Sequence, residues 1–278
     1  MKIAISTEST LDFQQDLIKE FGLEVIPFEI ILGDKSYVDG NITPEEIFEY
    51  VDAHKTLPKT TAINVFTYTE YFTELRTRYD AVIHIAMSSG ITSTVNNAKN
   101  AAKVVEGVTI IDSRSLTTGI GMLAIIAKRL ADEGKSVEEI VQAVKDCIEK
   151  VRVTFIVERL DYLHMGGRCS GLALFGANML KLRPRISLKD GRMAPDKKYR
   201  GSMEMVVKKY AEELLLENPE MSTEEAFVTY TVVSEGMVNE AVNALKNAGV
   251  KKIYKTRCNS TVSSHCGAGT LGIIFINK

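Results

Sequence analysis

The run Ala81-Val82-Ile83-His84-Ile85-Ala86-Met87, followed at once by Ser88-Ser89-Gly90-Ile91-Thr92-Ser93-Thr94, is the stretch that best indicates the fold. The first seven residues have the length and apolar character of a buried strand. The next seven form a loop rich in hydroxyl groups, and a helix is predicted to run from it to about Val105. Another strand is predicted at 108–111. A strand, a helix and a second strand in this order predict a parallel sheet covered by helices on both faces.

The same alternation extends through the first half of the chain. The further elements predicted there are a strand at 3–5, a helix at 11–20, an apolar β-rich segment at 23–32, and helices at 116–132 and 137–151. Capping-box patterns predict three helix starts, with the pairs Thr43 and Glu46, Thr67 and Glu70, and Ser136 and Glu139.

The second half has a different pattern. A strand at 153–157 leads into the glycine-rich segment 164–168, and the turn Lys189-Asp190-Gly191 joins two short strands in a hairpin. The other predicted elements are helices at 172–180, 202–217 and 236–247, and strands at 226–233, 252–255 and 271–277. The sequence therefore predicts two α/β domains, residues 1–155 with a largely parallel sheet and residues 156–278 with a mixed sheet.

The composition excludes several classes of protein. The 278 residues are 45% hydrophobic, as in a globular protein, and a formal net charge of -2 offers no basic surface for nucleic acid. The four cysteines have no metal or disulfide spacing, which favours a reducing compartment. The amino-terminal residues lack the apolar core of a secretory signal, and no apolar run approaches the ~20 residues of a membrane span. We therefore expect a cytoplasmic protein.

The motifs of common cofactor enzymes are also missing or misplaced. The segment 267–272 has the spacing G-x-G-x-x-G of a dinucleotide-binding loop, but it precedes a predicted terminal strand instead of opening a helix. Neither a phosphate-binding P-loop nor the G-x-S-x-G sequence of a hydrolase occurs, and the four histidines are not spaced as metal ligands. We therefore expect no cofactor, no metal and no catalytic residue.

Hydroxyl groups mark a candidate site for an anion. The loop 88–94 follows a parallel strand, and ligands bind at the carboxyl ends of such strands. It carries five hydroxyls, more than one helix cap needs, and it offers the free N–H groups of a helix start. The pair Thr60-Thr61 is a second, weaker candidate. His265 lies in a polar, glycine-rich segment that we predict to be a loop, and residues in such loops often carry function.

In these segments the sequence resembles the DegV family of fatty-acid-binding proteins. The resemblance rests on segments spread over nearly the whole chain, which are 6–12, 59–61, 88–94, 112–113, 160–168, 183–184, 189–191, 200–201 and 265–272. The most specific is Leu160-Asp161-Tyr162-Leu163-His164-Met165-Gly166-Gly167-Arg168. The chain departs from the usual family pattern at Glu8, where Asp is common, in the segment 92–94, and in 62–64, which lacks the usual proline.

The resemblance implies a long-chain fatty acid buried in and near the region between the domains. Its carboxylate would be held by hydroxyl-bearing residues, which are Thr60, Thr61, Ser88, Ser89, Thr92 and Ser93. Well-studied relatives present this carboxylate to a separate ATP-dependent fatty-acid kinase subunit, which makes an acyl phosphate. By the same resemblance, Arg200 and His265 would lie at the mouth and assist phosphoryl transfer, and Gly267 and Gly269 would shape a nearby loop.

Two other functions remain open on the sequence alone. One is a lipid sensor or carrier that works without any kinase. The other is a lipid hydrolase or transferase that uses a hydroxyl residue with His265, although the sequence shows no nucleophile motif to support it.

Overall fold

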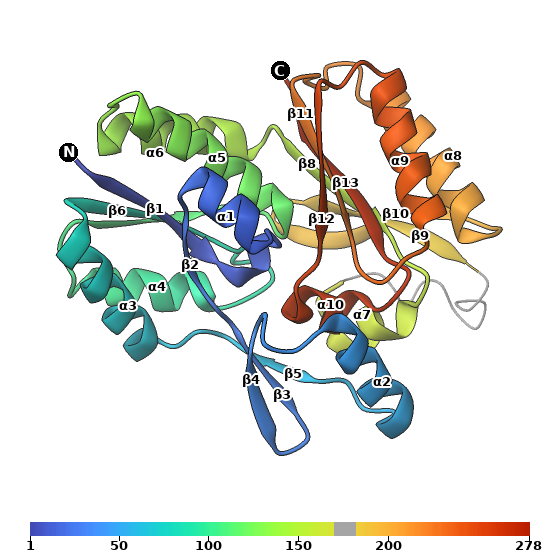
Figure 1. Cartoon of the computed structure of the whole chain (residues 1–278), viewed down its shortest axis with the longest axis horizontal. Coiled ribbons are helices and arrows are strands. Elements are labelled where there is room, and N and C mark those ends of the chain that lie inside the picture. The colour runs from blue at the N-terminus through green and yellow to red at the C-terminus, as the bar shows by residue number, and fades with distance from the viewer. Residues whose placement is uncertain (170–181) are drawn as a thin grey trace.

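Three β-sheets organise the chain in the computed structural model, which describes residues 1–169 and 182–278 (Figure 1). The first sheet consists of β1 (Ile3–Glu8), β2 (Glu24–Ile26), β6 (Ala81–Ala86) and β7 (Val108–Asp112) in the order β2-β1-β6-β7. All its pairs are parallel, as predicted. The chain passes from β1 outward to β2 and later returns to β6 on the other side of β1. This reversal puts a crevice at the carboxyl ends of β1 and β6, where open α/β sheets bind ligands.

Helices cover both faces of the parallel sheet (Figure 1). On one face are α5 (Thr118–Asp132) and α6 (Val137–Ile148), and on the other are α3 (Val65–Arg78) and α4 (Thr94–Ala102). A 3-10 turn at Ser9–Leu11 and the short helix α1 (Gln15–Phe21) connect β1 to β2.

The second sheet is mixed, as predicted, and has the order β10-β9-β8-β13-β11-β12. Its strands are β8 (Val151–Ile156), β9 (Arg183–Lys189), β10 (Arg192–Tyr199), β11 (Glu225–Tyr230), β12 (Lys252–Arg257) and β13 (Leu271–Ile276). Helices α8 (Met203–Glu217) and α9 (Glu235–Asn247) pack on its outer face. Helix α5 contacts β1 and β6 of the first sheet and also β8 and β13 of the second. One apolar core therefore continues through α5 from Ile5 and Ile83 to Val153 and Ile274.

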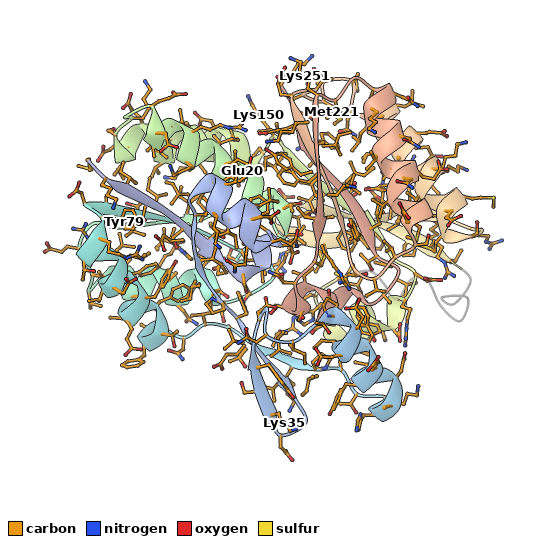
Figure 2. All side chains as sticks on the ribbon, in the orientation of Figure 1. Glu20, Lys35, Tyr79, Lys150, Met221 and Lys251 are labelled. Carbon is orange, nitrogen blue, oxygen red and sulfur yellow. The ribbon has the colours of Figure 1, made fainter. Side chains whose placement is uncertain are left out.

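A third, smaller sheet was not predicted as a separate unit. It is antiparallel, with the order β4-β3-β5, and consists of β3 (Glu29–Leu32), β4 (Lys35–Val38) and β5 (Lys59–Thr61). Lys35 marks the tip of the β3–β4 hairpin, which projects away from the rest of the chain (Figure 2). Three helices lie close to its other end, which are α2 (Pro44–His54), α7 (Leu160–Gly166) and α10 (Ser260–Cys266).

Two local predictions were wrong. Helix α3 begins two residues before Thr67, because the Asn64 side chain accepts a hydrogen bond from the Thr67 N–H and caps the helix. His265 lies in helix α10 and not in a loop. The capping boxes at Thr43 and Ser136 are confirmed.

Two predictions on the division of the chain stay untested. The helix predicted at 172–180 lies outside the described residues. The boundary near residue 155 also remains a prediction, although β8, which begins at Val151, pairs with strands of the mixed sheet. No helix among residues 1–169 and 182–278 has the length and apolar character needed to cross a membrane.

Candidate functional site

A cavity of about 260 Å³ lies where the three sheets meet. The loop after β6 forms one wall, helix α10 another, and residues of β5 and β10 complete it. The residues that line it are Phe28, Thr60, Ala62, Met87, Ile91, Thr92, Ser93, Leu116, Arg168, Met193, Thr261, Val262, His265 and Cys266. The cavity thus opens at the crevice that the reversal of strand order creates at the end of β6.

One end of the cavity is polar and partly exposed. Thr60 Oγ1 and His265 Nε2 are 2.8 Å apart and share a hydrogen bond between β5 and α10. Thr92 adds a hydroxyl from the loop, 2.7 Å from that of Thr94, and the exposed Ser93 adds another. Arg168, also exposed, brings a positive charge to this end. Hydroxyls, an imidazole and a guanidinium together can hold an anion such as a carboxylate.

The protonation of His265 is set by its surroundings. Burial lowers its pKa to about 4, and the positive charge of Arg168 acts in the same direction. His265 is therefore neutral near pH 7, with one ring nitrogen a donor and the other an acceptor. Within the described part of the chain, Nδ1 has no hydrogen-bond partner. The uncharged ring can donate from Nε2 to Thr60 Oγ1, which leaves the Thr60 hydroxyl able to donate to a ligand.

The other end of the cavity is apolar and buried. Met87, Leu116, Val262 and Cys266 are each less than one tenth exposed. Leu116, Val262 and Cys266 also line a neighbouring void of about 20 Å³, which reaches between β8 and β13. Burial raises the pKa of the Cys266 thiol to about 12, so this group is protonated at neutral pH and behaves as an apolar wall.

The structure brings four of the predicted site residues together at the cavity: Thr60, Thr92, Ser93 and His265. Thr61 does not line it, because successive side chains of a strand point to opposite faces and Thr61 faces solvent. Of the predicted pair Thr60 and Thr61, only Thr60 is among the residues that line the cavity.

Ser88 and Ser89 hold the loop in place and do not line the cavity. Ser88 Oγ donates to the carbonyl oxygen of Gly191 at 2.6 Å, in the turn between β9 and β10. The N–H of Ser89 donates to Asp112, and its side chain is exposed. A Cβ at Gly90 would lie 2.4 Å from the Gly191 oxygen, so the loop and the hairpin turn are in close contact.

The remaining predicted residues also lie outside the cavity lining. Arg200 is exposed, in the short connection from β10 to α8. Gly267 and Gly269 connect α10 to β13 and have φ of 76°. A Cβ at Gly267 would meet the Tyr162 ring at 2.8 Å, and one at Gly269 would meet Glu158 at 2.4 Å. In the described structure both glycines serve the backbone path and its packing.

Sequence reasoning missed several lining residues. Arg168 is the last residue of the segment 160–168, which carries the most specific resemblance to the DegV family. A cation directly after two glycines could have indicated a residue that reaches a site. Phe28 and Met193 had no such signal, because they reach the cavity only after β3 and the β9–β10 hairpin have paired with distant strands.

Comparisons with known proteins agree with this geometry. The family model described as "Uncharacterised protein, DegV family" matches residues 2–278. The chain belongs to the DegV family. A DegV domain-containing protein of Caldanaerobacter subterraneus subsp. tengcongensis is 31% identical over 281 residues, which cover 100% of this chain and 99% of the relative.

Two solved DegV structures share the whole fold. A DegV family protein from Thermus thermophilus, described as binding fatty acid, has a TM-score of 0.91 at 26% identity, with 100% of each chain covered. DegV of Bacillus subtilis, described as a fatty acid binding protein, has a TM-score of 0.83 at 25% identity, again with 100% of each chain covered.

Proposed function

We propose that this DegV protein binds one long-chain fatty acid, with the carboxylate at the polar end of the cavity and the acyl tail at the apolar end. The observation that carries the proposal is the division of the cavity itself. Thr60 and His265 share a hydrogen bond beside the charge of Arg168, whereas Leu116 and Val262 continue into the apolar void between β8 and β13. A fatty acid has the same division between an anionic head and an apolar tail.

The tail supplies most of the affinity in this proposal. Burial of a C16 chain stabilises the complex by about 12 kcal/mol at ~0.8 kcal/mol per methylene, whereas association costs roughly 4–15 kcal/mol. Each hydrogen bond to the carboxylate adds about 1.5–3 kcal/mol. The head group therefore fixes the orientation of the ligand and gives selectivity for the acid over an ester.

We further propose that the protein presents this carboxylate to a separate ATP-dependent kinase subunit. Support comes from the exposure of Ser93 and Arg168, which puts the polar end of the cavity at the surface. Arg200 is exposed as well and is free to contact a partner or an incoming phosphoryl group. A carrier without a kinase would use the same cavity, so an assay must separate the two.

Mass spectrometry of the organic extract of the purified protein is the first test. We expect about one long-chain fatty acid per chain. If the extract holds no acyl species and added palmitate neither binds nor raises the melting temperature, the proposal is wrong. Formation of acyl phosphate with a cognate kinase and ATP, and its loss in Arg200→Ala with palmitate affinity kept, would support the kinase partner over the stand-alone carrier.

The neighbouring threonines provide a matched pair of variants for the head group. Thr60→Val removes the hydroxyl that faces the cavity, and Thr61→Val removes one that faces solvent. Loss of one hydrogen bond to a charged group, about 1.5 kcal/mol, weakens palmitate binding roughly 10-fold in Thr60→Val. Isothermal titration calorimetry should show unchanged affinity in Thr61→Val, and equal losses in both variants would place the carboxylate elsewhere.

A further inference from the structure

Asp39 does not line the cavity and is almost fully buried, and its side chain joins two of the cavity walls. It lies directly after β4 and is 7% exposed. One carboxylate oxygen accepts from Ser9 Oγ at 2.7 Å, and the other accepts from the Thr261 N–H at 3.1 Å. Thr261 belongs to helix α10 and lines the cavity.

The Ser9 contact leads to the opposite wall. Ser9 Oγ also accepts from the N–H of Phe28 at 3.1 Å, and the N–H of Asp39 donates to the Phe28 carbonyl at 2.9 Å. Phe28 lines the cavity and directly precedes β3. Asp39 thus holds Phe28 on one side and the first turn of α10 on the other.

The two sets of contacts that start at Asp39, here called the Phe28 arm and the α10 arm, both lead to the polar end of the cavity. On one arm, Ile30 of β3 pairs with Thr60 of β5. On the other, His265 follows Thr261 by four residues, which is about one turn along α10. The two arms meet again in the bond between Thr60 Oγ1 and His265 Nε2. The position of His265 relative to Thr60 therefore depends on how Asp39 joins the two walls.

We propose that Asp39 is a positioning residue for the head-group site, which sets the Thr60–His265 pair through Phe28 and helix α10. The inference rests on the proposed function of this cavity and deepens it, since it assigns acid selectivity to a residue outside the cavity. Asp12 supports the same helix start, because its carboxylate accepts from the Asn259 N–H at 2.7 Å. Asn259, just before α10, also reaches Ser9, because its side-chain amide donates to the Ser9 carbonyl oxygen at 2.8 Å. Asp39 differs from both in that it bonds directly to Phe28 and to Thr261.

The test uses Asp39→Asn, which keeps the shape but replaces one acceptor oxygen by an NH2 group. Both bonds then lose the charge of the carboxylate, and the Ser9 hydroxyl must turn from donor to acceptor to meet the NH2 group, so the joint between the two walls is weakened. The measurement is the ratio of the dissociation constants of methyl palmitate and palmitate. We expect this ratio to fall at least ~5-fold in Asp39→Asn, because the acid loses its head contacts while the tail keeps its own.

Three further variants separate positioning from loss of stability. Ser136→Ala removes the capping box of α6, far from the cavity, and should leave the ratio unchanged. In a Thr60→Val background, Asp39→Asn should change the ratio no further, because the pair it positions is already broken. If Asp39→Asn does not fold, Ser9→Ala releases only the Phe28 arm and should lower the ratio in the same direction by less.

A readout without ligand keeps this inference separate from the proposed function. The side-chain NMR signal of His265, assigned by its absence in His265→Gln, should titrate near pH 4 in the natural protein. In Asp39→Asn it should titrate at a higher pH, because a displaced ring gains contact with water and loses part of the burial that lowers its pKa. Ser136→Ala should show the natural titration. If wild-type protein binds no palmitate, the proposed function is wrong whatever Asp39 does. If it does bind, an unchanged ratio together with an unchanged titration in Asp39→Asn overturns the inference about Asp39.

Discussion

His265 should make the stability of this protein depend on pH in mildly acidic solution. Burial and the charge of Arg168 lower its pKa to about 4 in the folded state, whereas an exposed histidine has a pKa of ~6.5. The unfolded chain therefore binds a proton that the folded chain does not bind between these two values. The stabilisation is fully present above pH 6.5 and is lost as the pH falls toward 4.

The size of the effect follows from the two pKa values. The full shift corresponds to about 3 kcal/mol at ~1.36 kcal/mol for each pH unit. The linkage relation gives a loss of about 0.8 kcal/mol at pH 6 and about 2 kcal/mol at pH 5, both relative to high pH. His265→Gln removes the titration and keeps a side chain that can bond to Thr60.

The assay is urea unfolding of wild type and His265→Gln in parallel at pH 7, 6 and 5. Burial raises the pKa of Asp12 and Asp39, which gives a dependence of the opposite sign, but both carboxyls are present in each protein and cancel in the difference. We expect the difference in unfolding free energy to shift in favour of the variant by about 2 kcal/mol between pH 7 and pH 5. A constant difference over this range would refute the buried, neutral state of His265.

Two further predictions concern stability away from the cavity. Arg185 is 6% exposed and bonds to both Asp196 and Glu217 at 2.8 Å. Arg185→Met leaves Asp196 with Ser187 and Glu217 with Lys197 as their remaining partners, and it should cost about 2 kcal/mol in urea unfolding. Asn64→Ala removes the observed cap of α3 and should lower the melting temperature in line with a loss of about 1 kcal/mol. Thr67→Ala changes the residue that the sequence suggested as the cap, and it should lower the melting temperature much less. A larger effect of Thr67→Ala would show that Thr67 caps the helix.

The parallel sheet could be predicted from the sequence, and a ligand edge proposed for it, because their signals are local. The apolar run 81–87 and the hydroxyl loop after it specify β6, its buried faces and the start of α4 without reference to the rest of the chain. The crevice then follows from the order of the parallel strands. For the same reason, Thr92 and Ser93 could be named as candidates from the loop alone.

The choice between Thr60 and Thr61 could not be made in this way. It depends on which face of β5 turns inward, and β5 is a three-residue strand that pairs with β3, some 30 positions earlier in the chain. Ser88 shows the opposite case, since its hydroxyl is used by Gly191, 103 positions away. Where a hydroxyl is used by a long-range contact, its residue type alone does not reveal whether it serves a ligand or the fold.

Among the described residues that line the cavity, the proposed head-group site combines neutral donors with one exposed cation, Arg168, and this has a chemical consequence. A buried Arg–carboxylate pair would hold the charge of the ligand strongly and keep it from reacting. Thr60, Thr92 and a neutral His265 instead offer hydrogen bonds of modest strength, while Arg168 stays near solvent, where its charge is screened. The apolar end carries the affinity, so the head can remain weakly held. A carboxylate bound in the proposed way would keep an oxygen available as a nucleophile, which the proposed transfer to a kinase requires and storage alone does not.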